Sequence, residues 1–276
     1  MPQVINTNLM SLNAQRNLSA TENLMSQSIQ RLSTGLRVNS AKDDAAGLAI
    51  AERMNAQVRG MNVAIRNAND GISLAQTAEG ALGKVGDMAQ RMRELSVQSA
   101  NATNSASDRA NLDAEYQQLA LEVTRTLAGT EFNGTAIVGG GAGPLAFQIG
   151  AGTTTNDVVT VTTTDMTAAA AVTAVTGGDI TSTANATTAM DNLDTLIDTV
   201  STERSTYGAM QNRFEAIIAN LEISSENQAS ARSRIMDADF AAETASLTRG
   251  QVLQQAGTAM LSQANSAPQN VLALLR

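Results

Sequence analysis

The residue types that carry most enzymatic chemistry are absent from this chain. Its 276 residues include no His and no Cys. Histidine acid–base catalysis, Ser–His–Asp triads, thiolate or disulfide chemistry and zinc sites of the usual kind are therefore excluded. Carboxylates remain, but no motif joins them to a group that would activate them. We expect no enzymatic activity, no catalytic or metal-binding residue, and no cofactor.

Two local patterns invite a ligand-site interpretation, and each has a simpler one. Residues 139–144, Gly-Gly-Gly-Ala-Gly-Pro, lack the Gly-Lys-Ser/Thr ending of a phosphate-binding loop and do not lead from a strand into a helix. We interpret them as a flexible loop. Asp191, Asp194 and Asp198 share one face of a predicted helix, and a solvated acidic face is favoured over a cation site.

Composition argues against two classes of partner. The formal net charge is −8 with only 18 basic residues, whereas nucleic-acid binding needs clustered Lys and Arg. No stretch approaches the roughly 18 consecutive apolar residues of a membrane span. The amphipathic segments also lack basic faces and aromatic anchors, which disfavours a secreted membrane-active protein. The start shows no basic segment followed by an apolar one, so if the protein leaves the cell we expect it to do so without a cleaved signal peptide.

Long amphipathic helices at both ends must position any functional surface. Large apolar residues recur at steps of three, four and seven over residues 4–36 and again over 253–274. Such steps place each set in one stripe along a helix, and a stripe needs a partner. We expect the two stripes to pair and to bury their remaining surface against other copies of the molecule. Pro268 is expected to kink the second helix or end its regular part. The predicted self-assembly seam consists of Leu18, Met25, Ile29, Leu32, Leu36, Leu253, Met260, Val271 and Leu274.

The same periodicity predicts three inner helices, over residues 45–100, 107–129 and 187–235. Ser40 with Asp43 has the spacing of a capping box for the first, and Ser107 or Asp108 is expected to cap the second. Several glycines interrupt the first of these helices, each costing about 1 kcal/mol relative to Ala. Tertiary packing must therefore stabilise that helix.

The segment between the second and third inner helices follows a different pattern. Phe-Asn-Gly-Thr at residues 132–135 is a turn signal, and residues 145–149 and 158–162 are predicted strands. Residues 163–186 are mostly Thr, Ala and Gly, and we interpret them as exposed and of low complexity. Apolar content is 43% and aromatic content only 2%, which suits thin helical rods better than a thick core. The fold prediction is a mainly α protein: an elongated antiparallel helical bundle with a terminal coiled-coil pair and a small β-hairpin region.

Several runs are more distinctive than any short motif. The longest is residues 33–50, Ser-Thr-Gly-Leu-Arg-Val-Asn-Ser-Ala-Lys-Asp-Asp-Ala-Ala-Gly-Leu-Ala-Ile. The others occupy residues 4–8, 91–98, 131–134, 235–240 and 269–275. Together these runs resemble bacterial flagellin, the subunit of the flagellar filament, over nearly the whole chain outside residues 139–186.

The resemblance implies a secreted, extracellular structural subunit that self-assembles into the flagellar filament for swimming motility. It implies a lumen-lining terminal coiled-coil domain (1–43 with 234–276), a rod-like helical shell domain (44–140 with 187–233) and a reduced variable surface region (141–186). The implied partners are identical subunits, a flagellar export chaperone, the cap and the hook-associated proteins. A hook–filament junction protein, which shares the terminal helices, is the alternative; the complete runs at 33–50 and 235–240 favour flagellin.

The resemblance also implies recognition by the host Toll-like receptor 5. Arg91, Leu95 and Glu115 match positions that flagellins of this type use for that recognition. Arg91 and Leu95 are one helical turn apart, so we expect them to share a face. The alternative is that these residues pack or are solvated between neighbouring subunits, and the two interpretations are compatible.

Overall fold

The computed structural model describes the backbone of residues 7–273 and the side chains of residues 7–266. The chain divides into two compact units, one made of residues 1–56 with 227–276 and the other of residues 57–226. Helices dominate both units, which confirms the mainly α prediction. None of the helices within the described part of the chain is both long enough and apolar enough to span a membrane.

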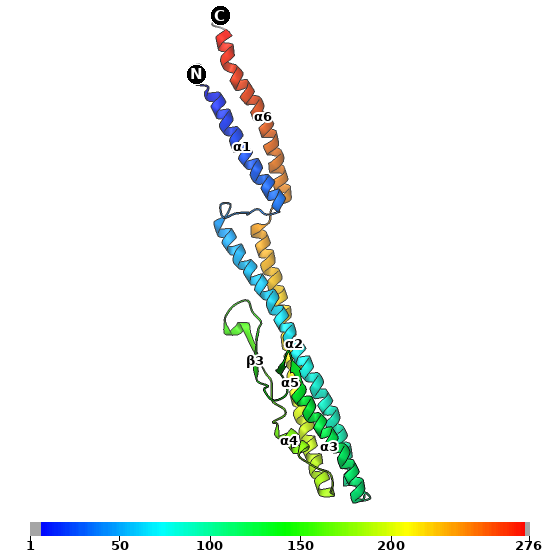
Figure 1. Ribbon diagram of the computed structural model, residues 1–276. Coiled ribbons are helices and arrows are strands. Elements are labelled where there is room, and N and C mark those ends of the chain that lie inside the picture. The colour runs from blue at the N-terminus through cyan, green and yellow to red at the C-terminus, as the bar shows by residue number, and fades with distance from the viewer. Residues whose placement is uncertain (1–6, 274–276) are drawn as a thin grey trace. The chain divides into compact units, whose positions relative to one another are not determined.

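The first unit contains the two terminal helices, α1 (Leu9–Thr34) and α6 (Phe240–Ala273). They lie side by side and antiparallel, with the beginning of α1 next to the end of α6 (Figure 1). Helix α1 ends at Gly35, whose φ of 72° is the left-handed conformation that glycine adopts readily. Helix α6 continues past Pro268, so the regular helix does not end there.

Two short linkers, one after α1 and one before α6, pair with each other. Leu36 and Asp237 form an antiparallel bridge, and the backbone N–H of Ala238 donates to the carbonyl of Gly35 at 2.9 Å. The Arg37 guanidinium donates to the carbonyl of Ile235 at 2.7 Å. These hydrogen bonds fix the register between residues 35–37 and residues 235–238 within the first unit.

Helix α2 (Ala45–Ala100) begins at the predicted residue but with a different cap. Asp44 accepts a hydrogen bond from the backbone N–H of Gly47 at 2.8 Å. Asp43 instead accepts from the hydroxyl and backbone N–H of Ser40 and from the backbone N–H of Asn39, which lowers its pKa. The predicted Ser40–Asp43 pair therefore forms a turn before the helix, because the adjacent Asp44 is the carboxylate that reaches the first helical turn.

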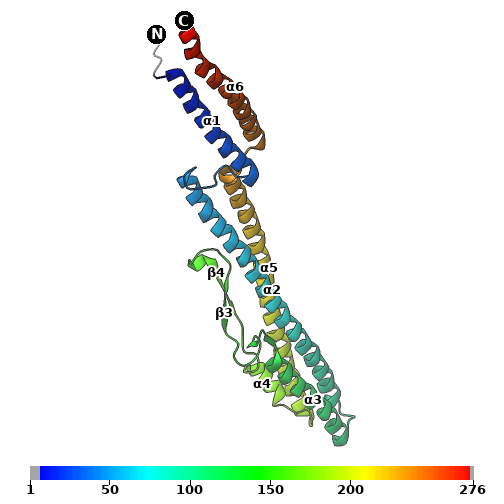
Figure 2. The same ribbon diagram turned by 45° about the horizontal axis from the view of Figure 1, so that its top comes forward.

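The second unit is built from the rest of α2 with α3 (Ala106–Gly129) and the first part of α5 (Thr183–Met236) (Figure 2). Helix α3 begins with a capping box in which Ser105 and Asp108 bond each other's backbone, so the cap lies at Ser105 and not at Ser107 or Asp108. The fully buried core side chains include Leu82, Met92, Tyr116, Leu127, Leu193, Tyr207 and Phe214.

Two small hairpins follow α3. Strands β1 (Glu131–Phe132) and β2 (Thr135–Ala136) are joined by Asn133 and Gly134, both with positive φ, as the Asn-Gly signal predicts. Strands β3 (Pro144–Gln148) and β4 (Val158–Thr162) pair antiparallel, with a short 3₁₀ helix, η1 (Thr155–Asp157), between them. Phe147 of β3 packs edge-on against Phe214 of α5, with ring centroids 5.5 Å apart.

Residues 163–186 are not the exposed, low-complexity segment that the sequence suggested. They contain helix α4 (Ala170–Thr176), and Met166, Val172, Val175 and Ile180 are all at most 2% exposed. The Tyr116 hydroxyl donates to the carbonyl of Val175 at 3.1 Å. The few large apolar residues among the Thr and Ala form one buried face against the helices, and α5 consequently starts at Thr183, earlier than predicted.

Candidate self-assembly surface

The contact between α1 and α6 is made largely by small and polar residues. Ser11 and Ser28 are the buried residues of α1, and Gly250 is buried on α6. The Ser11 hydroxyl donates to Oδ1 of Asn265 at 2.8 Å, and the Asn8 amide donates to the carbonyl of Ala264 at 2.7 Å. These bonds set the register of the pair, but they bury little apolar surface.

Two glycines of α6 let the helices approach closely. A β-carbon at Gly257 would lie 3.2 Å from Cδ1 of Leu18, and one at Gly250 would lie 3.6 Å from Cβ of Met25. Leu18 and Met25 are accordingly half-buried in the contact. Arg31 and Glu243 form an ion pair of 3.8 Å between the same two helices. The expectation that the terminal helices pair with each other is confirmed.

The large apolar residues of both helices are mostly left in solvent. On α1, the exposed fraction is 70% for Leu9, 64% for Leu24 and 51% for Ile29. On α6, it is 59% for Val252 and 50% for Leu253. Met10, Leu12, Phe240 and Met260 are exposed as well. Many exposed large apolar side chains on one pair of helices are typical of an interaction site. The exposed apolar faces of α1 and α6, defined by these nine residues, are the candidate self-assembly surface.

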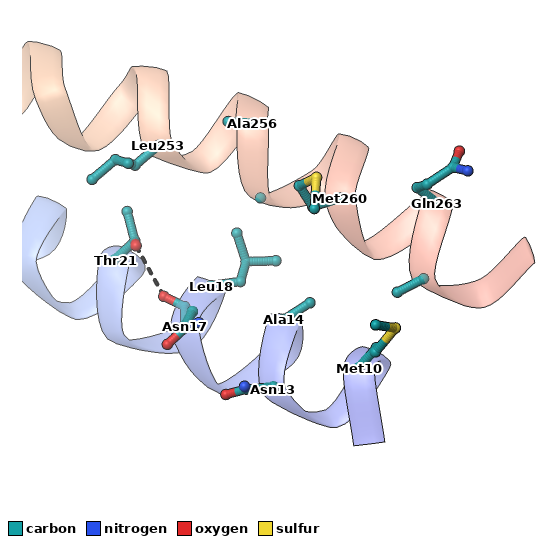
Figure 3. Close-up of a pocket in the computed structure, with 12 residues that line it drawn as sticks. Met10, Asn13, Ala14, Asn17, Leu18, Thr21, Leu253, Ala256, Met260 and Gln263 are labelled. Carbon is teal, nitrogen blue, oxygen red and sulfur yellow. Dashed lines mark hydrogen bonds between the residues drawn. The ribbon is translucent and has the colours of Figure 1, made fainter. Parts of the chain in front are cut away.

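A groove of about 670 Å³ lies between the two helices. Leu18 points from α1 toward α6, between Leu253 and Met260, and Met10 points toward α6 further along (Figure 3). Gly257 also lines the groove. Its lining is therefore mainly apolar, and it holds no cluster of groups suited to catalysis.

The predicted seam residues fall into two groups. Leu18, Met25, Leu32 and Leu36 are half-buried within the first unit, whereas Ile29, Leu253 and Met260 are exposed. The side chain of Val271 and all of Leu274 lie outside the described residues. The predicted stripes of α1 and α6 therefore do not only face each other, because part of each stripe is exposed to solvent.

Sequence reasoning overlooked Met10, Leu24 and Val252 as members of the surface. Each is a large apolar residue next to or off the chosen stripe. The sequence does contain a feature that could have revealed them. Apolar residues occur on more than one side of each terminal helix, which is typical of a helix with several neighbours.

The residues expected to face a receptor differ in exposure. Arg91 is exposed, and its Nε and Nη2 atoms lie 3.0 and 2.9 Å from Oε1 of Glu115, while Nη1 lies 2.9 Å from Oε2 of Glu94. Hydrogen bonds to Glu94 and then Glu115 raise the pKa of Arg91. Leu95 is only 1% exposed and belongs to the core of the second unit. One turn of α2 separates them, but the helix is covered on the Leu95 side and open on the Arg91 side.

One carboxylate of the acidic face at Asp191, Asp194 and Asp198 is engaged in an ion pair. Asp194 pairs with Arg93 of α2, with 2.5 Å between Oδ1 and Nε, which lowers the pKa of the carboxyl. Within residues 7–273, no group of three or more acidic side chains is placed to hold a metal ion.

Comparison with known families identifies the family of this chain. The family model for the bacterial flagellin N-terminal helical region matches residues 5–142, and the model for the C-terminal helical region matches residues 190–275. The chain belongs to the bacterial flagellin family. This flagellin is therefore a structural subunit of the extracellular flagellar filament, which is a homopolymer.

Relatives and solved structures agree. The flagellin of Halalkalibacterium halodurans is 47% identical over 99% of this chain and its own full length. The flagellin of Bacillus subtilis is 41% identical over 99% of this chain and 99% of its own. The crystal structure of Bacillus cereus flagellin, 32% identical, has a TM-score of 0.51 and covers 56% of this chain and 88% of that one.

Proposed function

We propose that the exposed apolar faces of α1 and α6 are the surface through which this flagellin joins neighbouring copies in the filament. The observation that carries the proposal is the mismatch within the terminal pair. The contact between the helices buries serines and glycine, while nine large apolar side chains remain exposed. Burying apolar surface contributes about 25 cal/mol per Å², so a second copy that covers these faces gains many small increments at once.

Membership of a family that forms a homopolymeric filament makes identical subunits the occupant we propose. A contact between different patches of identical chains is not self-complementary and propagates into an open helical array. From the resemblance to flagellins, we propose that residues 1–43 with 234–276 belong to the layer that lines the filament lumen. Residues 44–140 with 187–233 form the surrounding shell in this proposal, and residues 141–186 form the reduced outer region.

Substitution at Leu253 tests the surface. Leu253→Asp places a charge on the exposed face of α6 and is expected to abolish filament growth, whereas Leu253→Met keeps the position apolar and is expected to polymerise normally. Filaments are scored by electron microscopy after seeding purified monomer. Circular dichroism and urea unfolding should show the second unit equally folded in both variants. Normal filaments from Leu253→Asp would overturn the proposal, and Leu18→Asp provides the corresponding test on α1.

A second function rests on the exposed ion pair of Arg91. We infer that Toll-like receptor 5 contacts Arg91 and Glu115, and that Leu95 acts only by holding α2 in place. The support is that Arg91 and Glu115 are both exposed and already oriented toward each other by two hydrogen bonds. Preorganised charged groups are suited to electrostatic recognition by a partner.

The receptor proposal is tested with a cell reporter assay. Arg91→Ala is expected to lower the response, whereas Arg125→Ala is the matched control because Arg125 is also exposed and paired with a glutamate, Glu122. Both variants should show the same helix content. An unchanged response to Arg91→Ala would contradict direct contact.

Further partners follow from the role of a filament subunit. An export chaperone, the filament cap and the hook-associated proteins are proposed to bind the terminal helices, which carry the exposed apolar faces.

The junction-protein alternative is disfavoured because the family models and full-length relatives are flagellins. A putative hook-associated protein of Vibrio parahaemolyticus, 11% identical, shares the fold alone, with a TM-score of 0.58. Long filaments grown from this protein by itself would separate the two.

A further inference from the structure

The methionines of this chain are distributed unevenly between core and surface. The sequence contains 12 Met residues. Among those whose side chains the structure describes, Met61, Met92 and Met166 are buried and most others are half-buried. Met10 and Met260 alone in that set are exposed, at 65% and 64%.

Both exposed methionines line the same groove. Met10 comes from α1 and Met260 from the facing helix α6, and Ala14 and Leu18 of α1 line the same groove (Figure 3). Their thioether sulfurs are the oxidisable atoms of a lining that is mainly apolar, with Asn13, Asn17, Thr21 and Gln263 as its polar members. The chain has no Cys to compete for an oxidant.

We propose that Met10 and Met260 form an oxidation-sensitive modification site that controls whether the free subunit can polymerise. The modifying class of molecule is a small two-electron oxidant such as hydrogen peroxide. The peroxide O–O bond breaks, an S–O bond forms on the thioether sulfur, and water leaves. The sulfur is oxidised by two electrons and the peroxide is reduced by two. The product, methionine sulfoxide, is polar, and the change is one that sulfoxide reductases reverse.

The consequence for assembly follows from what the groove must do. The inference rests on the proposed self-assembly surface, because a neighbouring copy is expected to cover the groove. The sulfoxide oxygen must give up hydrogen bonds to water when another copy covers the groove. The mutational cost of burying a polar group in this way corresponds to roughly tenfold in an equilibrium constant. Oxidised monomer should therefore need at least about tenfold higher concentration to polymerise. Once the filament has formed, the same two sulfurs should be covered and react slowly.

The first experiment maps the reaction. Monomer and preformed filament are treated with limiting hydrogen peroxide and digested, and sulfoxide is quantified at each methionine by mass spectrometry. Met10 and Met260 are expected to oxidise first in the monomer and to be protected in the filament, while Met61 and Met92 stay reduced in both. Equal oxidation of Met10 and Met260 in monomer and filament would overturn the inference.

The second experiment measures assembly. Seeded polymerisation of oxidised wild type is compared with that of the Met10→Leu, Met260→Leu double variant after the same treatment. Each protein is compared with its own untreated form: peroxide is expected to raise the concentration that the wild type needs to polymerise about tenfold, and to leave that of the double variant where it was before treatment. Met25→Leu with Met236→Leu, two half-buried positions of the same unit, is the matched control and should remain oxidation-sensitive.

The outcomes separate this inference from the proposed function. If oxidised wild type polymerises at the concentration of untreated protein while Leu253→Asp does not polymerise, the surface stands and the methionine switch is wrong. If the untreated double leucine variant fails to polymerise, Met10→Leu and Met260→Leu are tested singly. Persistent oxidation sensitivity in both single variants and in the control would place the sensitive residue elsewhere and overturn the inference. If Leu253→Asp polymerises normally, the proposed surface itself is wrong.

Discussion

The ring of Phe214 in α5 lies directly against Gly71 in α2. A β-carbon at position 71 would be 2.7 Å from Cζ of Phe214, closer than real side-chain carbons approach. Glycine in the middle of a 56-residue helix is thus explained by packing at this position. Gly80, in the same helix, has nothing within 4 Å of its β-carbon position.

This pair predicts opposite effects of one substitution at two sites. Gly71→Ala should destabilise the second unit by about 1–3 kcal/mol because of overpacking. Gly80→Ala should stabilise it by about 0.5–1 kcal/mol because alanine restricts the unfolded chain and favours helix. Urea unfolding of the monomer measures both. A stabilising Gly71→Ala would mean that Phe214 moves aside without cost.

Leu95 and Arg91 should separate in their effects on stability. Leu95→Ala removes a buried side chain and is expected to cost about 2–5 kcal/mol of unfolding free energy. Arg91→Ala removes only exposed, solvent-screened ion pairs and is expected to change the unfolding free energy little. Thermal and urea unfolding of the two monomers provide the comparison. Similar losses in both would show that the Arg91 ion pairs contribute more than exposed pairs usually do.

The two buried tyrosines predict a loss of stability at high pH. Burial raises the pKa of Tyr116 to about 12, and the pKa of Tyr207 to about 12 for the same reason. In the unfolded chain each hydroxyl ionises near its ordinary pKa of about 10. The folded state then holds more protons than the unfolded state, so the stabilising contribution is fully present below pH 10 and is lost as the pH rises toward 12.

The urea midpoint measured from pH 8 to pH 12, with tyrosinate absorbance followed in parallel, tests this behaviour. Tyr116→Phe loses the hydrogen bond to Val175 and should be about 1 kcal/mol less stable at neutral pH, with a weaker alkaline dependence. A midpoint that does not change across that pH range would contradict the burial argument.

Amide exchange should distinguish the two units of the free subunit. Helix α1 buries only Ser11 and Ser28, whereas Leu82, Val85 and Met92 of α2 are fully buried. Local opening is easiest where few apolar contacts are lost. We expect fast exchange throughout α1 and α6 in dilute monomer, slow exchange around Leu82, and strong protection of α1 and α6 after polymerisation. Terminal helices as protected as α2 in the monomer would count against assembly-dependent stabilisation.

Local sequence signals determined several element boundaries. The left-handed conformation of Gly35 ends α1, the Asn133-Gly134 pair makes the first hairpin turn, and α2 runs from Ala45 to Ala100 as its periodicity predicts. These features depend on the φ preferences and spacing of neighbouring residues, which the sequence contains in full. The distinctive runs likewise sufficed to identify the family.

Tertiary structure alone decided which faces are covered. Periodicity places Arg91 and Leu95 one turn apart, but the neighbouring helices cover only Leu95. Val172 and Val175 look isolated among Thr and Ala, yet they fill a space beside Tyr116. Burial is a property of two surfaces that meet, and the second surface comes from residues far away in the chain.

The same limit explains the candidate self-assembly surface. The sequence established that both terminal helices are amphipathic and pair with each other. It did not show that the pair would meet through Ser11, Ser28 and Gly250, because the register of two helices depends on how closely their backbones approach. That close approach is what leaves Leu9, Leu253 and the other large side chains in solvent.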